Sequence, residues 1–106
     1  MKVGVVVYSG DAETVWNAIR FGNFVMSMGD QTTTFLLGKG VELESLKSGK
    51  FNIAEQLNIY RDLGGKIFAC GTCLEIHHIQ TSNVYTVATM KDLYEIIKES
   101  DKVVSF

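Results

Sequence analysis

Two cysteines in a Cys-x-x-Cys motif, Cys70 and Cys73, are the only thiols in the chain of 106 residues. Gly71, between them, allows the backbone to turn sharply after a short apolar segment. A cysteine at the start of a helix is stabilised as a thiolate by the unpaired backbone amides and the helix dipole. A thiolate is the form of cysteine that attacks sulfur. The motif therefore predicts sulfur chemistry at Cys70 or Cys73.

Strand and helix patterns alternate along the whole sequence around this motif. Apolar, β-branched segments predict strands at residues 2–8, 31–37, 66–69, 83–88 and 102–106. Apolar residues at helical spacing predict helices that follow N-caps at Asp11, Asn52 and Thr89, and a short helix is expected over 73–80. Residues 41–49 are expected to form a loop with at most one helical turn. The third strand leads directly into Cys70.

Strands that are each separated by a helix or a crossover must run parallel, because a hairpin cannot return the chain in the same direction. The sequence thus predicts an α/β fold, a three-layer α/β/α sandwich, formed by residues 1–106 as a single domain. In such sheets reacting groups gather at the carboxyl ends of the strands. Four segments are expected to meet there: 9–12, 38–41, 70–73 and 88–90. We call these four segments the rim.

The charged residues do not indicate a nucleic-acid partner. Twelve acidic and ten basic side chains give a formal net charge of -2, and the basic residues are scattered among acidic ones. The apolar run at 3–7 is too short for a signal-peptide core, and no segment has the length needed to span a membrane. Two cysteines without an export signal favour a reducing compartment, so we expect a cytoplasmic protein without a membrane partner.

A thioredoxin-like thiol-disulfide protein is one alternative, because Cys-x-x-Cys between a strand and a helix is typical of that class. Thioredoxin-like proteins place a cis-proline beside the active disulfide, and this chain contains no proline. The motif also follows the third strand rather than the first.

A metal-binding module is a second alternative, since Cys73 and His77 lie one helical turn apart and His78 follows. Zinc requires a tetrahedral ligand set, which Cys70, Cys73 and the two histidines can hardly supply from nine consecutive residues. We therefore assign no metal. Gly38-Lys39-Gly40 matches neither a dinucleotide fingerprint nor a Walker loop, so no cofactor is expected either.

The segment 68–74, Phe-Ala-Cys-Gly-Thr-Cys-Leu, resembles the motif of the DsrE/DsrF-like family. It is especially similar to the DsrE-like domain at the end of the selenium-metabolism protein YedF. Segments 13–18, 35–41 and 101–106 also look like this family, so the resemblance covers essentially the whole chain.

The resemblance implies a five-stranded parallel sheet in the order 4-3-2-1-5. It implies a sulfurtransferase-like persulfide carrier in which Cys70 matches the cysteine that carries the persulfide in sulfur-relay members. It also implies sulfur donor and acceptor proteins as partners, and a homo-oligomer, a trimer or hexamer. Cys73 is absent from the simple carriers and is a candidate resolving thiol. A binding module for a metal or small ligand, or a Cys-x-x-Cys redox protein, remains the alternative.

Overall fold

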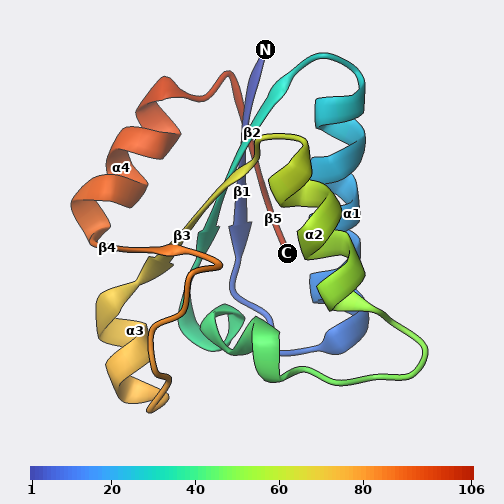
Figure 1. Ribbon diagram of the computed structural model, residues 1–106. Coiled ribbons are helices and arrows are strands. Elements are labelled where there is room, and N and C mark those ends of the chain that lie inside the picture. Colours follow the sequence, from blue (N-terminus) through green and yellow to red (C-terminus); the bar gives the residue numbers. More distant parts are fainter.

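The computed structural model describes residues 1–106 and contains one sheet of five parallel strands (Figure 1). The strands are β1 (Lys2–Val7), β2 (Gln31–Leu36), β3 (Lys66–Cys70), β4 (Thr86–Ala88) and β5 (Lys102–Ser105). The helices are α1 (Ala12–Ser27), the 3-10 helix η1 (Gly38–Ser45), α2 (Ile53–Asp62), α3 (Gly71–Ile76) and α4 (Met90–Glu99). The strand order is β4-β3-β2-β1-β5, and all neighbouring strands are parallel. The predicted α/β fold and strand order are confirmed.

Helices cover both faces of the sheet, with α1 and α2 on one side and α4 on the other (Figure 1). The larger core cluster joins α1 and α2 to the sheet through residues such as Ile19, Tyr60 and Ile67. A smaller cluster on the α4 side contains Phe35 and Cys70. Successive residues of a strand point to opposite faces, so Ala69 belongs to the larger cluster and Cys70 to the smaller one.

The predicted helix starts are present. The Asp11 side chain accepts a hydrogen bond from the amide of Thr14 at 3.0 Å, and the Asn52 side chain accepts one from the amide of Glu55 at 3.0 Å. Thr89 and Asp92 form a reciprocal capping box at the start of α4. These side chains pair amides that the first turn of a helix leaves without partners.

The segment after β2 differs from the expectation of a loop with at most one helical turn. It forms η1, an eight-residue 3-10 helix that begins at Gly38. Gly38 has a φ of +54°, and Gly40 passes so close to β1 that a Cβ there would lie 2.0 Å from the Val7 carbonyl oxygen. Within η1, the side chains of Val41 and Leu43 are buried. Burial of these apolar residues fixes the segment as a helix despite its weak helical pattern.

Helix α3 and strand β4 also differ from the sequence prediction. α3 begins at Gly71 rather than 73 and ends at Ile76 rather than 80, because His78 adopts a left-handed φ of +54°. The amides of His78 and Ile79 donate to the carbonyl oxygens of Glu75 and Leu74, a Schellman termination. β4 contains three residues instead of six, since residues 83–85 form a turn that buries Tyr85.

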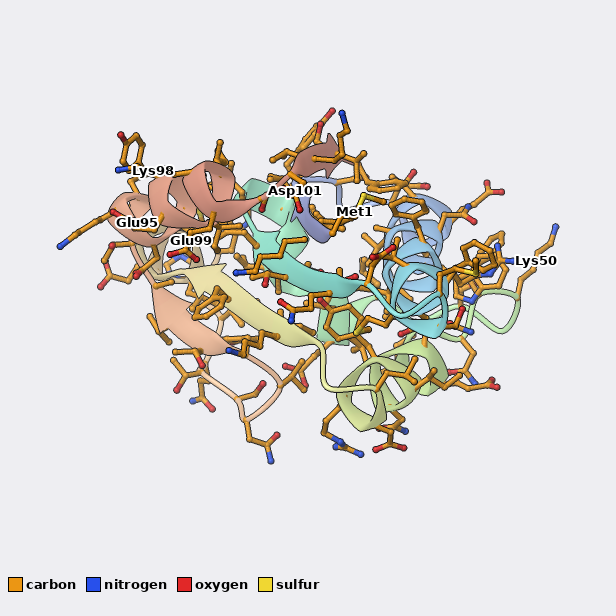
Figure 2. The ribbon with its side chains drawn as sticks, turned by 90° about the horizontal axis from the view of Figure 1, so that it is seen from above. Met1, Lys50, Glu95, Lys98, Glu99 and Asp101 are labelled. Carbon is orange, nitrogen blue, oxygen red and sulfur yellow. The ribbon has the colours of Figure 1, made fainter.

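None of the helices combines the length and the apolar character that crossing a bilayer requires. From above, Glu95, Lys98 and Glu99 of α4 lie on one flank of the sheet and Lys50 on the opposite flank (Figure 2). Charged side chains thus lie on both flanks of the sheet.

Candidate functional site

The rim segments meet at the carboxyl end of the sheet, where η1 and α3 also lie (Figure 1). Segment 9–12 contacts segment 38–41, because a Cβ on Gly10 would lie 3.2 Å from the Lys39 side chain. Segment 70–73 lies against segment 88–90, where Cys70 is paired in register with Ala88. A hydrogen bond between Gly38 and Cys73 joins the two pairs of segments. The expectation that all four segments meet is therefore met.

Cys70 is the last residue of β3 and the N-cap of α3. Its Sγ accepts a hydrogen bond from the amide of Cys73 at 3.4 Å. The side chain packs with Phe35 and Ala88, and the residue is only 3% exposed. A thiolate at Sγ would strengthen this hydrogen bond, since amide donors stabilise the negative charge.

Cys73 lies one turn further on and is partly exposed. Its Sγ accepts a hydrogen bond from the amide of Gly38 at 3.2 Å. Burial of the sulfur raises the pKa of the Cys73 thiol, the hydrogen bond with Cys70 raises it further, and the Gly38 amide lowers it. The expectation that the helix start lowers a thiol pKa is wrong for Cys73, because desolvation outweighs the amide donor. Cys73 is therefore a neutral thiol at neutral pH.

A pocket of about 460 Å³ lies beside the two cysteines. Residues 70–73 and 87–90 line it, and we call it the cysteine pocket. Val87 is 49% exposed and Met90 is 58% exposed, so both stand where the pocket opens to solvent. A Cβ on Gly71 would lie 3.2 Å from Cγ1 of Val87, so a larger side chain at 71 would press on Val87 in the wall of the pocket. Of the two thiols, Cys73 is the more exposed.

The two histidines are not gathered with the cysteines as metal ligands. Nδ1 of His77 lies 3.0 Å from Oε1 of Glu42, which ties α3 to η1. No group of three histidine, cysteine, aspartate or glutamate side chains is arranged to hold a metal ion. The sequence analysis missed Glu42, because it is 35 positions from His77 in a segment expected to be irregular.

Another cavity, of about 640 Å³, lies between η1, α2 and the loop that joins them. Its lining includes Leu43, Phe51 and Leu57 but neither cysteine. Lys39 lies against Gly10 and does not line the cysteine pocket. The cysteine pocket is therefore the site at which a reactive side chain and an opening to solvent coincide.

The chain is similar to known proteins over its whole length. The model of the DsrE/DsrF-like family matches residues 1–106. The uncharacterized protein MJ0989 of Methanocaldococcus jannaschii is 28% identical over 114 residues, with both chains fully covered. The uncharacterized protein MK0008 of Methanopyrus kandleri is 27% identical over 100 residues, which cover 89% of this chain and 83% of that one.

Solved structures share the fold. The crystal structure of the YchN protein from E. coli superimposes with a TM-score of 0.81 at 23% identity, covering 100% of both chains. The conserved protein of unknown function BT1422 from Bacteroides thetaiotaomicron gives a TM-score of 0.80 at 21% identity, covering 99% of this chain and 94% of that one. At these identities the likeness supports the architecture of the sheet and its helices.

Proposed function

The chain belongs to the DsrE/DsrF-like family, and from this premise we propose that it is a sulfur-relay protein in which Cys70 accepts a persulfide sulfur and passes it on. Membership suggests a function of the sulfur-relay type. The assignment of the step to Cys70 rests on one observation: the strand-end sulfur caps α3 and lines a pocket that opens to solvent.

The transfer is a displacement at sulfur. The Cys70 thiolate attacks the outer sulfur of a donor persulfide, R–S–SH, and a new bond forms between Sγ and that sulfur. The bond within the donor persulfide breaks, the donor leaves as a thiolate, R–S⁻, and the proton stays on the transferred outer sulfur. Cys70 then carries a persulfide, whose outer sulfur an acceptor thiolate removes by the same step. No net oxidation or reduction occurs.

Cys73 is proposed as a resolving thiol. Its amide already donates to Sγ of Cys70, so the two side chains belong to one turn of α3. If the Cys73 thiolate attacks Sγ of persulfidated Cys70, a Cys70–Cys73 disulfide forms and hydrosulfide leaves. The raised pKa of Cys73 makes this attack slow at neutral pH, so the persulfide has time to reach an acceptor.

The proposal also gives the protein a cellular compartment, partner proteins and an oligomeric state. We place it in the cytoplasm, where cysteines stay reduced, and we propose donor and acceptor proteins as partners. We also propose a homo-oligomer, a trimer or hexamer, because Phe24 and Met28 are more than 60% exposed on α1. As the family model spans 1–106, we propose that these residues act as one domain.

A thiol-disulfide redox role is the second candidate, and it is favoured by the proximity of Cys70 and Cys73. Elemental and sulfur analysis of protein purified without added metal tests the proposal against both alternatives. We expect labile sulfur on the protein after exposure to a persulfide donor, and no stoichiometric zinc. Stoichiometric zinc would contradict the carrier function, as would rapid conversion to the disulfide without a persulfide stage.

A further inference from the structure

The walls of the cysteine pocket carry no charge. Residues 70–73 supply two thiols, a glycine and a threonine, and residues 87–90 supply Val, Ala, Thr and Met. No lysine, arginine or histidine lines the pocket. An anion that leaves water for such a surface loses hydration without gaining a cationic partner.

The charged side chain that is hydrogen-bonded to the wall of the cysteine pocket is the carboxylate of Asp92, which is negative. Oδ2 of Asp92 accepts hydrogen bonds from the amide of Thr89 at 2.8 Å and from its hydroxyl at 3.0 Å. Thr89 is one of the residues that line the pocket. The capping carboxylate thus offsets the positive end of α4 beside the pocket and repels approaching anions.

The neighbouring cationic side chains do not line the pocket. The carbon chain of Lys39 lies against Gly10, and Lys91, which follows Met90 in α4, is not among the lining residues. His77 is bonded to Glu42, at the far end of α3 from Cys70. The raised pKa of Cys73 agrees with a poorly hydrated surface.

We propose that the cysteine pocket selects sulfur donors by charge: Cys70 takes sulfur from an uncharged organic persulfide and discriminates against thiosulfate and other anionic sulfur compounds. This inference rests on the proposed function and adds the chemical class of the donor. A persulfide on a cysteine residue flanked by uncharged residues has this chemistry, as does a small neutral persulfide. In both cases the Cys70 thiolate takes the outer sulfur with its proton, and the donor leaves as a thiolate that carries a single charge. With thiosulfate the leaving group is sulfite, a dianion that the pocket has no cation to stabilise.

The test uses donors that differ in one group. N-acetylcysteine amide persulfide is neutral apart from its reactive sulfur, and N-acetylcysteine persulfide carries one carboxylate in place of the amide. Second-order rate constants for the gain of one sulfur atom are measured by mass spectrometry at low ionic strength, with thiosulfate as a third donor. We expect the neutral donor to load Cys70 about tenfold faster than the carboxylate donor, and thiosulfate to be slower still.

Two variants test whether charge at the pocket is the cause. Met90→Lys places a cation at the mouth of the cysteine pocket. It should lower the ratio of the rate constants, neutral donor over carboxylate donor, about fivefold. Val103→Lys makes a similar change on an exposed residue of β5, at the opposite edge of the sheet from β4, and should leave the preference as it is in the wild type. A preference that Met90→Lys does not alter contradicts the inference, and so does equal loading by all donors.

The outcomes separate this inference from the function on which it rests. Equal or faster loading by the anionic donors overturns the charge selection and leaves persulfide transfer standing. Failure of every donor to load Cys70 overturns both. A further arm with the same persulfide in a neutral decapeptide identifies the source: faster loading from the peptide indicates a polypeptide donor, and equal rates indicate a small molecule.

Discussion

The backbone amide of Gly38 donates a hydrogen bond to Sγ of Cys73 over 3.2 Å, which joins the start of η1 to the first turn of α3. Gly38 reaches this position with a φ of +54°, a conformation that residues with a side chain rarely adopt. The contact fixes the sulfur of Cys73 beneath η1. One of the two thiols is thereby held in place by a segment 35 residues away.

The acidity of Cys73 provides a first prediction. In a Cys70→Ala variant the pKa of Cys73 should fall relative to the wild type, because the hydrogen bond with Cys70 that raises it is gone. It should stay above the pKa of the same thiol in urea-unfolded protein, because burial, the largest cause, remains. The rate of iodoacetamide alkylation as a function of pH gives the pKa of Cys73 in each of these proteins. A midpoint at or below that of the unfolded chain would show that the amide of Gly38 dominates instead.

A second prediction concerns the close approach of η1 to β1. A Cβ on Gly40 would lie 2.0 Å from the Val7 carbonyl oxygen, so Gly40→Ala must displace backbone and should lower the free energy of unfolding by about 2–3 kcal/mol. Gly49→Ala is the matched control, since a Cβ there meets nothing within 4 Å. Urea unfolding followed by circular dichroism gives both values. Equal stabilities would refute the packing of η1 against β1.

The buried hydroxyl of Tyr60 supplies a third prediction. It lies 2.8 Å from Oγ1 of Thr34 and donates to the carbonyl oxygen of Lys66 at 3.0 Å, and burial raises the pKa of the phenol. Tyr60→Phe leaves these partners unsatisfied and should cost about 1–2 kcal/mol of unfolding free energy. Tyr94→Phe, on an exposed side chain, should change stability by less than about 0.5 kcal/mol. An unchanged free energy of unfolding in Tyr60→Phe would mean that the hydroxyl does not form these hydrogen bonds.

Self-association is the fourth prediction. Sedimentation equilibrium at micromolar concentration should give a trimer or a hexamer. Phe24→Ser should weaken the association, because the ring is 62% exposed and has no reason to be apolar in a monomer. Tyr94 has a comparable exposure of 61% on α4, on the other face of the sheet, and Tyr94→Ser serves as the control. A monomer in all three proteins would exclude the oligomer.

The elements that carry strong local signals could be predicted from the sequence. Asp11 and Asn52 cap helices as expected, and the β-branched segments formed parallel strands, whose order had been implied by the family resemblance. The position of Cys70 at a strand end followed from these patterns. Local periodicity and capping decide such features, because they depend on residues within a few positions of each other.

Features that depend on distant contacts could not be predicted. The helix η1 is fixed by buried Val41 and Leu43 rather than by its own pattern. α3 ends at Ile76 because His78 adopts a conformation usually adopted by glycine. The meeting of segments 70–73 and 88–90 was expected, but the burial of Cys70 and the shape of the pocket beside it depend on how the side chains pack in the folded sheet.

The division of labour between the two thiols is the central claim, and one mass measurement tests it most directly. Wild type, Cys70→Ser and Cys73→Ser are exposed to a neutral persulfide donor, and the gain of one sulfur atom is followed over time. Serine is a good N-cap, so Cys70→Ser keeps the start of α3 and removes only the nucleophile. We expect Cys70→Ser to load poorly, and Cys73→Ser to load like the wild type and hold its persulfide longer. Loading that survives the loss of Cys70 but not of Cys73 would contradict the account and make Cys73 the primary nucleophile.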